Sequence, residues 1–571
     1  MGKLKLNWLK DDQRLFMERG YLEQGETPEQ RYDTICDTVE SISMKLSKTP
    51  ESKEYCAGIG DRFRGYISDN WVSFSTPVLK SFGSPKNLPI SCYKSVLDDS
   101  LDDIYLGLHE IGMLAKNGGG TSQNFSNIRG MGSDISTGGF SNSVLDWVEL
   151  YADMMSKTAQ NSQRRGFVTA YLSVSHPEIM DFLDIGTKAM PKEKQRFFQT
   201  ITTGVTLPIG WRDDLKSNPE KRKIFTKILN TRKEAGFPYI IDLENANNQR
   251  PQVYKDKGLY INSSNICTEV FGFADPLKTF VCCLSSANAY WFDDWKNHPT
   301  FLKDMRIMLD CVIEEFIEKA KGKSGFQKAV RYAEEHRSVG LGIIAFHSYL
   351  QKKSVVVGSL QCAAINTDIF KTLQEGALEG SKYMAEHFGE APLMEGTGLR
   401  SDLDLAQAPT KSTAFLMGGE EMSFSEGVGI RTSNYNEKKL AKIQVEDKNK
   451  ELLNVLELIG ENTTETWSSI MGNNGSVQHL PFLSEHQKDV FKTFSEVSQV
   501  DIINMAAMRQ KYIDQGQSIN IMVHPDTPAK DIIKLHLDAF DMGIKSLYYQ
   551  YSINAAQKFS QDLMQCSSCE G

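Results

Sequence analysis

The sequence predicts an α/β protein, in which helices and strands alternate along the chain. Three observations support this fold class. The chain has 571 residues, of which 40% are hydrophobic and 24% charged, and this balance supplies a large core. Some segments alternate apolar and polar side chains, as strands do, and others repeat apolar residues every three or four positions, as helices do. The two kinds of segment alternate through the middle of the chain, which favours a sheet covered by helices.

The first elements follow from local patterns. Residues 1–70 are predicted to form a helical segment with short polar breaks. Residues 71–79, WVSFSTPVL, alternate and contain β-forming side chains, so they predict a strand. Ser100 is a capping residue with an acidic residue three positions later, and it predicts the start of a helix over residues 102–116. A second helix is predicted over residues 144–156, where apolar side chains recur on one side.

The last elements are a helix, a strand and a tail. Thr527 and Pro528 predict the start of a helix, as a cap and a first helical residue. Residues 544–551, IKSLYYQY, predict a strand. Residues 554–571 are polar with small side chains and predict a mobile tail. A surface hairpin with a turn at DKNK is expected within residues 437–456.

Composition narrows the location and the partners. The net charge is −9 and the pI is about 5.7, so long DNA or RNA is not an expected partner. The N-terminal residues lack the apolar core of a signal peptide, and no run of about 18 apolar residues predicts a membrane span. We therefore expect a cytoplasmic protein whose ten cysteines are mostly reduced, which favours redox or catalytic use over a disulfide framework.

One short motif places three reactive side chain types at alternate positions. Asn265, Cys267 and Glu269 would share one face of an extended segment, so that a thiol lies between an amide and a carboxylate. A buried cysteine in an ordinary strand is the alternative interpretation, because free cysteine is among the most buried residue types.

Other cysteines are open to the same two interpretations. Cys92, Cys282 and Cys283 are each compatible with a core position, but two of them meeting with Cα atoms about 5.5 Å apart could form a disulfide and supply two electrons. Cys566 and Cys569 form a CxxC pair on the polar tail. Half of a zinc site is the alternative there, but no second CxxC or nearby histidine pair completes four ligands, so redox exchange is favoured and no metal is expected.

Two further motifs are weak when taken alone. Tyr548 and Tyr549 are adjacent phenols, which can relay an electron and a proton or can simply pack on opposite faces. Residues 409–413, PTKST, could bind a phosphate at a helix N-terminus or act as a plain helix cap, and they lack the spacing of a Walker loop.

Taken together and in order, these motifs resemble the catalytic subunit of aerobic, class I ribonucleotide reductases. The resemblance covers residues 71–571. It implies a ten-stranded α/β barrel of two five-stranded parallel halves over residues 71–553, after the helical segment 1–70 and before the mobile redox tail 554–571. The motifs that carry it are STP at 75–77, SC at 91–92, NxCxE at 265–269, CxLSSxN at 282–288, PTKST at 409–413, the tyrosine pair and the terminal cysteine pair.

The resemblance also implies roles for single residues. Cys267 would be the thiyl radical that takes the 3′ hydrogen of a ribonucleoside diphosphate, Glu269 the general base on the 3′ hydroxyl, and Asn265 a ribose ligand. Cys92 and Cys282 would be oxidised to a disulfide as the 2′ hydroxyl leaves; family spacing favours Cys282 over Cys283. The residues implied in substrate binding are Thr76, Ser91, Gly120, Lys411, Ser412 and Thr413.

The implied partners and regulators lie outside the chain. Tyr548 and Tyr549 would receive the oxidising equivalent from a separate small subunit that carries the radical or metal cofactor, so no cofactor is expected in this chain. Cys566 and Cys569 would re-reduce the active-site disulfide and be reduced in turn by thioredoxin or glutaredoxin. ATP and deoxynucleotide effectors would bind near a homodimer interface formed by helices 102–116 and 144–156. The effector residues implied are Asp99, Ser100, Arg129 and Arg165.

The sequence departs from many relatives at its N-terminus, and three other functions remain as alternatives. The strand with Ser75 comes too early for the N-terminal ATP-binding domain of many relatives, so on/off control by ATP and dATP is expected to be absent or to lie on the partner subunit. The alternatives are an adenosylcobalamin-dependent reductase, a nucleotide-sensing protein that kept the fold, and a thiol-disulfide oxidoreductase built around the terminal CxxC pair.

Overall fold

A run of five parallel strands forms one half of the centre of the molecule. In the computed structural model, which describes residues 4–158, 167–195, 197–419, 422–440 and 443–552, these strands neighbour one another in chain order. Both of their faces are buried, as is usual for parallel strands between helices and a second layer. The strands are β2 (Cys92–Val96), β3 (Gly120–Asn124), β4 (Val168–Ser173), β5 (Ile201–Leu207) and β6 (Tyr239–Asp242).

The other half consists of five parallel segments. The middle segment, at residues 405–407, is joined to both of its neighbours only by isolated bridges. β8 pairs in parallel with β9, Leu341 bridges Leu405, Gln407 bridges Gln517, and β12 pairs in parallel with β14. An extra short strand, β1, lies antiparallel to β8. The strands concerned are β1 (Val72–Phe74), β7 (Phe280–Val281), β8 (Leu284–Asn288), β9 (Gly340–Ile344), β12 (Ile521–Met522), β13 (Ser546–Leu547) and β14 (Gln550–Tyr551).

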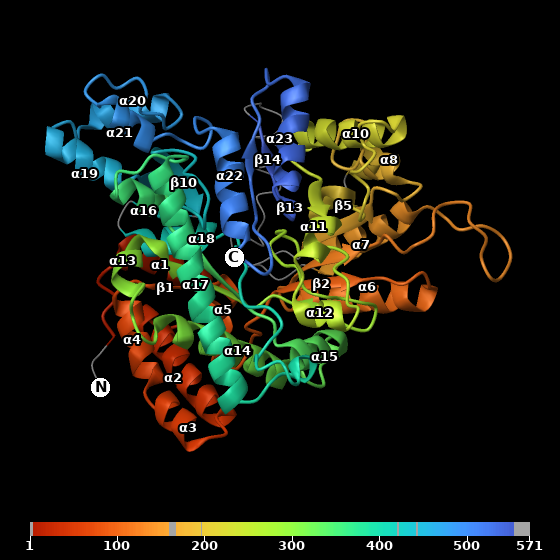
Figure 1. Cartoon of the computed structure of the whole chain (residues 1–571), viewed down its shortest axis with the longest axis horizontal. Helices are drawn as coiled ribbons and strands as arrows, with labels where there is room; N and C mark the ends of the chain where they lie inside the picture. Colours follow the sequence, from red (N-terminus) through yellow and green to blue (C-terminus); the bar gives the residue numbers. More distant parts are fainter. Residues whose placement is uncertain (1–3, 159–166, 196, 420–421, 441–442, 553–571) are drawn as a thin grey trace.

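Two antiparallel pairings close these halves into a barrel. β2 pairs with β7 at one junction, and β6 pairs with β13 at the other. In the part of the chain that the structure describes, the strands therefore form the ten-stranded α/β barrel of two five-stranded halves that the sequence resemblance implied. In Figure 1, β13 and β14 lie in the middle of the molecule, where the second half meets the first.

Helices cover the barrel on the outside. Those of the first half lie together on one side of the molecule, beside the long loop between β3 and α7. Most of those of the second half lie in the middle and on the other side, but α23 lies next to α10 and α15 lies next to α12 (Figure 1). The first set is α6 (Leu101–Lys116), α7 (Val144–Thr158), α8 (Ile179–Phe182), α9 (Lys192–Gln195), η1 (Phe197–Thr200), α10 (Pro219–Ala235), α11 (Leu243–Asn248) and α12 (Gln252–Asp256). The second set is η2 (Ala289–Trp291), α13 (Phe292–Trp295), α14 (Phe301–Ala320), α15 (Gln327–His336), α16 (Phe346–Lys352), α17 (Leu360–His387), η3 (Pro392–Met394), α18 (Lys411–Gly418), α22 (Gln499–Gln510) and α23 (Ala529–Asp541).

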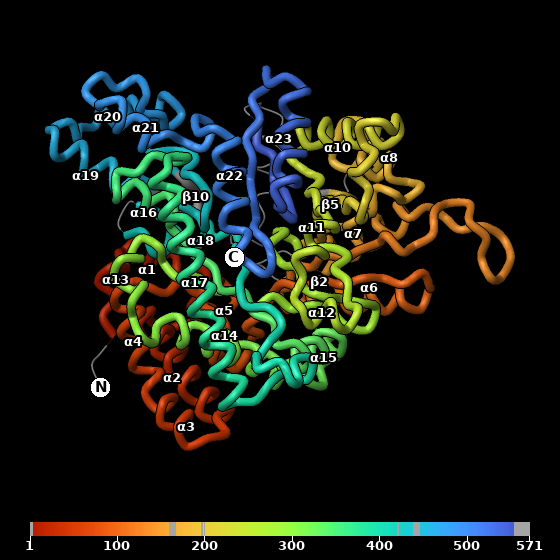
Figure 2. The backbone as a smooth tube through the Cα atoms, viewed as in Figure 1, coloured from red at the N-terminus to blue at the C-terminus, as the bar shows by residue number. Residues whose placement is uncertain are grey.

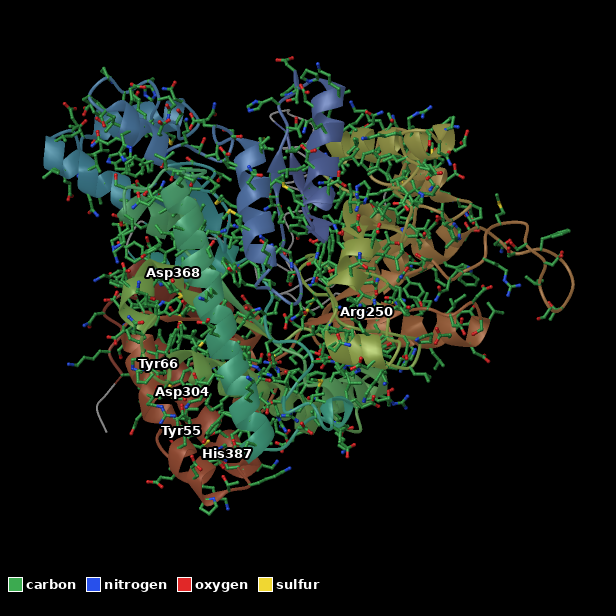
Figure 3. The ribbon with its side chains drawn as sticks, in the orientation of Figure 1. Tyr55, Tyr66, Arg250, Asp304, Asp368 and His387 are labelled. Atoms are coloured by element: carbon green, nitrogen blue, oxygen red, sulfur yellow. The ribbon has the colours of Figure 1, made fainter. Side chains whose placement is uncertain are left out.

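The N-terminal helices pack against α14, and one carboxylate anchors them there. Asp304 of α14 accepts hydrogen bonds from Tyr55 and Tyr66 at 2.7 and 2.8 Å, and from Arg62 at 2.7 Å. Tyr55, Tyr66 and Asp304 lie together at this contact, which we call the N-terminal interface (Figure 3). The helices are α1 (Asp11–Gly20), α2 (Pro28–Leu46), α3 (Pro50–Cys56) and α4 (Ile59–Ser68).

A smaller group of elements lies at one corner of the molecule, beyond α16 (Figure 2). It includes a hairpin, as expected within residues 437–456, but the turn is not at DKNK: Asp447 and Lys448 end a strand, and Asn449 caps the next helix. The elements are β10 (Tyr435–Leu440), β11 (Ile443–Lys448), α19 (Lys450–Ile459), α20 (Thr464–Gly472) and α21 (Glu485–Val490).

Two other local predictions need correction. The strand predicted over residues 71–79 ends at Phe74, and α5 (Thr76–Ser81) follows, because Pro77 suits the first turn of a helix and cannot donate to a sheet. Thr527 does not cap α23; Pro528 occupies the N-cap position, without a side-chain hydrogen bond. The helices predicted over residues 102–116 and 144–156 are confirmed as α6 and α7. Within the described ranges, no helix is long and apolar enough to cross a membrane.

Candidate active site

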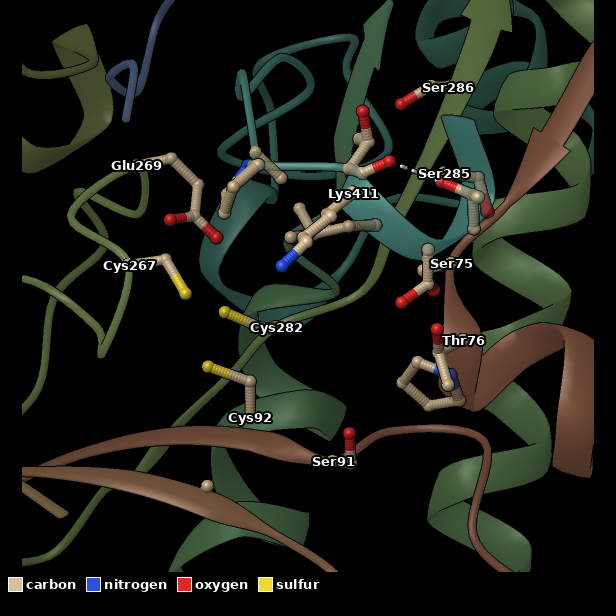
Figure 4. Close-up of a pocket in the computed structure, with 18 of the residues that line it drawn as sticks. Ser75, Thr76, Ser91, Cys92, Cys267, Glu269, Cys282, Ser285, Ser286 and Lys411 are labelled. Carbon is tan, nitrogen blue, oxygen red and sulfur yellow. Dashed lines mark hydrogen bonds between the residues drawn. The ribbon is translucent and has the colours of Figure 1, made fainter. Parts of the chain in front are cut away.

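A cavity lies where segments from both halves of the barrel meet. Cys92, Cys267 and Cys282 line it, and their sulfur atoms point into a common space with Glu269 beside them (Figure 4). We call it the thiol cavity. Its other lining residues include Ser73, Ser75, Thr76, Ser91, Gly120, Ser285, Ser286 and residues 408–413.

Antiparallel pairing explains how two cysteines far apart in sequence meet. Tyr93 of β2 pairs with Val281 of β7, so Cys92 lies opposite Cys282, and the backbone N–H of Cys282 donates to the carbonyl of Cys92 at 2.9 Å. Residues directly opposite in an antiparallel pair have Cα atoms about 4.5–5.5 Å apart, which is within the range that a disulfide spans. Both are free thiols in this structure, and burial together with the neighbouring Cys92 thiol raises the pKa of Cys282 well above its usual value.

Cys283 faces the opposite way. Successive side chains of an extended segment alternate between faces, and the Cys283 thiol lies 3.3 Å from the carbonyl of Leu309 in the core behind the strand. Burial raises the pKa of this thiol. The backbone geometry therefore separates the two adjacent cysteines, placing one in the cavity and the other in the core.

Cys267 lies on a loop in the barrel interior, residues 262–272, which we call the finger loop. The extended conformation expected for the NxCxE motif is wrong: residues 266–268 form a turn, and Thr268 has a φ of 68°, in the left-handed region. Hydroxyl groups from several strands hold the loop backbone. Tyr171 donates to the carbonyl of Asn265, and Ser546 donates to that of Thr268, both at 2.8 Å.

The turn still directs Asn265 and Glu269 towards the thiols. The side-chain amide nitrogen of Asn265 donates to Glu269 Oε1 at 2.8 Å, and it lies 3.6 Å from the sulfur atoms of both Cys92 and Cys282. The side-chain oxygen of Asn265, Oδ1, accepts from the backbone N–H of Val270 at 3.2 Å, and this hydrogen bond fixes the orientation of the side-chain amide. One amide therefore connects the carboxylate to both thiols of the pair.

Glu269 is almost completely buried, with 2% exposure, and burial raises its pKa to about 7. Hydrogen bonds from Asn265 and Ser518 oppose this shift because they stabilise the carboxylate. A carboxyl group with a pKa near neutrality can accept and return a proton during a reaction.

Polar groups line the end of the cavity away from Glu269. Thr76 begins α5, Lys411 begins α18, and Ser412 and Thr413 follow in its first turn. Lys411 points into the cavity, and Thr76 and Ser91 lie across from it (Figure 4). Gly120, at the start of β3, donates its backbone N–H to the carbonyl of Ser91 at 2.7 Å. Hydroxyls, an ammonium group and helix N-termini are the groups that bind phosphate oxygens.

The tyrosine pair packs beside the finger loop, with the two ring planes inclined by 59°. The ring centroids of Tyr548 and Tyr549 are 4.4 Å apart, and Tyr548 belongs to the same buried cluster as Cys267. Sequence reasoning missed a third ring: Tyr239 of β6 lies 4.7 Å from Tyr548 and 5.1 Å from Tyr549. Only the pairing of β6 with β13 brings it there, so no local signal in the sequence could have indicated it.

Three of the expected effector residues, Asp99, Ser100 and Arg129, lie outside the thiol cavity. Arg129 pairs with Asp99 at 2.6 Å, and its Nη1 donates to the carbonyl of Asp134 at 2.6 Å. Ser100 accepts from the backbone of Asp103 at 3.2 Å and so caps α6. Three expected site residues, Arg165, Cys566 and Cys569, lie outside the residues that the structure describes. Within the described ranges no group of three or more histidine, cysteine or acidic side chains could hold a metal ion.

Comparisons with known proteins agree on one family. The family model "Ribonucleotide reductase, barrel domain" matches residues 90–210, 212–398 and 392–550. The chain is 32% identical to a ribonucleoside-diphosphate reductase large subunit of Invertebrate iridescent virus 3, over 87% of this chain and 89% of that protein. It is 30% identical to a putative large subunit of Frog virus 3, over 91% and 94%. The structure is similar to the Actinobacillus ureae class Id ribonucleotide reductase alpha subunit, with a TM-score of 0.87 and 39% identity over 99% of this chain and 100% of the other.

Proposed function

Since this chain belongs to the family of ribonucleotide reductase large subunits and is the catalytic subunit of a ribonucleoside-diphosphate reductase, we propose a role for each polar residue of the thiol cavity. The observation that carries the proposal is the convergence of Cys92, Cys267 and Cys282 around the Asn265 amide and the Glu269 carboxylate.

Cys267 is the residue that carries the unpaired electron. As a thiyl radical it takes the hydrogen from C3′ of the ribose, and Glu269 accepts the proton of the 3′ hydroxyl. The 2′ hydroxyl then leaves as water, with a proton from the Cys92 and Cys282 pair. The second hydrogen of the pair goes to C2′, and the two thiols, having supplied two electrons, become a disulfide. Glu269 returns its proton to the 3′ oxygen, and Cys267 returns its hydrogen to C3′. Support comes from the single cavity that the three cysteines and Glu269 line together. The burial of Cys267 also supports the assignment, since a thiyl radical must be shielded from water.

The substrate diphosphate binds at the opposite end of the cavity. Lys411, Ser412 and Thr413 at the start of α18, with Thr76 and Ser91 across from them, supply the donors, and Gly120 lines the same cavity without a side chain to fill it. A diphosphate held there leaves the ribose over the three thiols, because the same cavity contains both groups. Binding energy from this remote part of the substrate would orient the sugar for the reaction.

The radical reaches Cys267 through the tyrosine pair. Tyr549 packs against Tyr548, which belongs to the buried cluster that contains Cys267, and this contact supports stepwise transfer of an electron and a proton. The source is a radical-generating cofactor on a separate small subunit, as in class I enzymes of this family.

Homodimer formation through α6 is supported by its exposed apolar side chains, Leu101, Tyr105 and Leu106. Asp99 and Arg129, near the N-terminus of α6, are the effector ligands. We place the enzyme in the cytoplasm, where thioredoxin or glutaredoxin is available.

Production of dCDP tests this assignment. The chain is mixed with its cognate small subunit, CDP, ATP and dithiothreitol, and we expect dCDP from the wild type. Cys267→Ser is expected to lower the rate by about a thousand-fold or more, as removal of a covalent catalytic group does. Retained activity in Cys267→Ser would contradict the assignment. Activity with adenosylcobalamin and no second protein would contradict the small-subunit partner.

The terminal cysteine pair is tested by changing the reductant. Cys566→Ser combined with Cys569→Ser is expected to preserve turnover with dithiothreitol, which enters the cavity directly, and to abolish turnover with thioredoxin. Equal turnover of this variant with both reductants would remove the tail from the proposal and leave the cavity chemistry unaffected.

A further inference from the structure

Ser518 contacts the proposed general base from outside the thiol cavity. Its hydroxyl lies 3.1 Å from Glu269 Oε2 and 2.5 Å from the carbonyl oxygen of Cys267. Ser518 does not line the thiol cavity; it lines a second cavity, which meets the first at Ala408 and Pro409, so a substrate in the first cavity would not touch it.

The backbone of Ser518 is fixed, so the position of its hydroxyl is well defined. Its N–H donates to the carbonyl of Gln407 at 3.0 Å, and Gln407 bridges the preceding residue, Gln517, within the second half-barrel. The N–H of Gly516 donates to the carbonyl of Glu269 at 2.8 Å, which joins this strand segment to the finger loop a second time. The Glu269 carboxylate is therefore held from two sides, by Asn265 at Oε1 and by Ser518 at Oε2.

The single hydroxyl proton of Ser518 cannot be donated to Glu269 Oε2 and to the Cys267 carbonyl oxygen at the same time. When Glu269 is ionised, the carboxylate is the stronger acceptor, so Ser518 donates to Oε2. When Glu269 is protonated at Oε2, the acid donates to Ser518 Oγ, and the serine proton turns to the Cys267 carbonyl. The two protonation states of the base therefore correspond to two hydrogen-bond arrangements of the residue that carries the radical.

We propose that Ser518 is a positioning residue that holds Glu269 in its ionised form and transmits the protonation of this base to the backbone of Cys267. This inference rests on the proposed role of Glu269 as general base. No bond to the substrate is formed or broken by Ser518.

The expected consequence is a change in pH dependence. The titratable groups around Glu269 are Cys267 on its own loop, Cys282 of the β7–β8 segment and Tyr171 of β4, and Lys411 of α18 lines the same cavity. Burial raises the pKa of Glu269 to about 7, and the Ser518 hydrogen bond lowers it from what burial alone would give. The ionised form is the active base, so activity falls as the pH drops below the pKa. Loss of the Ser518 hydroxyl raises the pKa further and moves the acid limb to higher pH.

The test compares two serines that bond to neighbouring carbonyls of the same loop. Ser518→Ala touches the base, whereas Ser546→Ala removes only the hydrogen bond to the Thr268 carbonyl, a contact of 2.8 Å. The pH profile of kcat/KM for CDP is measured with saturating small subunit and dithiothreitol. We expect the acid limb of Ser518→Ala to move up by about one pH unit, with the rate approaching that of the wild type at high pH. The limb of Ser546→Ala is expected to stay in place.

A CDP deuterated at C3′ supplies a second readout. In Ser518→Ala below pH 7 we expect a larger deuterium isotope effect than in the wild type, because abstraction of the 3′ hydrogen becomes slower relative to other steps. Ser518→Thr, which keeps the hydroxyl, is expected to restore both profiles. If Ser518→Ala fails to fold, as judged by thermal unfolding, Ser518→Cys is measured instead, and its acid limb is expected to move in the same direction.

The outcomes distinguish a failure of the Ser518 inference from a failure of the proposed role of Glu269. Parallel profiles for Ser518→Ala and Ser546→Ala, with Glu269→Gln inactive, would overturn this inference and leave the proposed function standing. An active Glu269→Gln would overturn both, since no base would remain for Ser518 to hold.

Discussion

The thiol cavity and the N-terminal interface both gather buried cysteines, but their surroundings differ. In the cavity, Cys92 and Cys282 share the Asn265 amide, and Glu269 lies beside it. In the N-terminal interface, the Cys311 sulfur lies 3.8 Å from the carbonyl of Val39, and Cys56 accepts from the Ser47 hydroxyl at 3.5 Å.

The difference shows that burial and proximity do not by themselves make a thiol reactive. Burial raises the pKa of thiols in both regions, as it does for Cys282 and Cys311. The cavity adds a side-chain base, a movable proton and space for a ligand, whereas the partners of Cys311 and Cys56 are fixed groups of packed helices. The reactive set is therefore defined by what the thiols face, and variants in the two regions should separate activity from stability.

The largest expected contrast is between two buried tyrosines. Tyr548→Phe removes the phenol next to Cys267 and is expected to lower dCDP formation by about a thousand-fold or more, because a phenylalanine cannot be oxidised in the relay. Tyr66→Phe removes a 2.8 Å hydrogen bond to Asp304 and is expected to keep the activity while costing about 1–2 kcal/mol of stability. Steady-state rates and chemical denaturation measure the two effects. Activity in Tyr548→Phe would show that the radical takes another path.

Adjacent cysteines provide the next contrast. Cys282→Ser is expected to reduce multiple-turnover activity by about a hundred-fold or more, because one of the two electron donors is lost. Cys283→Ser, whose side chain faces Leu309 in the core, is expected to retain activity and lose about 1 kcal/mol of stability. Reversed results for the two variants would mean that Cys283 is the partner of Cys92.

The smallest effect on activity is expected at the N-terminal interface. Asp304→Ala leaves Tyr55, Tyr66 and Arg62 without their shared acceptor, and we expect a loss of about 3 kcal/mol in the free energy of unfolding. The rate of dCDP formation at 25 °C should remain within about two-fold of the wild type, a change below ~0.5 kcal/mol. A large loss of activity in a folded Asp304→Ala protein would mean that the two regions are coupled.

The sequence contained much of the fold and many of the site residues, and what it lacked has physical causes. The periodicity of apolar residues was enough to predict the helices α6 and α7, because each has a continuous apolar stripe. It could not distinguish a strand from a helix after Phe74, where a proline begins a helix in a short segment.

The candidate site shows the same limit. Alternation suggested a shared face for Asn265, Cys267 and Glu269, but a turn at Thr268 places them, and its left-handed conformation has no local sequence signal. Ser518 and Tyr239 reach the site only through strand pairing across the barrel, and a single sequence does not contain that pairing.

Mapping the disulfide formed in one turnover tests the central claim most directly. The pre-reduced enzyme with Cys566→Ser and Cys569→Ser is mixed with its small subunit, CDP and ATP without reductant, quenched, alkylated and digested. We predict one dCDP per active site and a peptide that links Cys92 to Cys282, with Cys283 and Cys311 alkylated as free thiols. Formation of dCDP with Cys92 and Cys282 both recovered as free thiols would contradict the account.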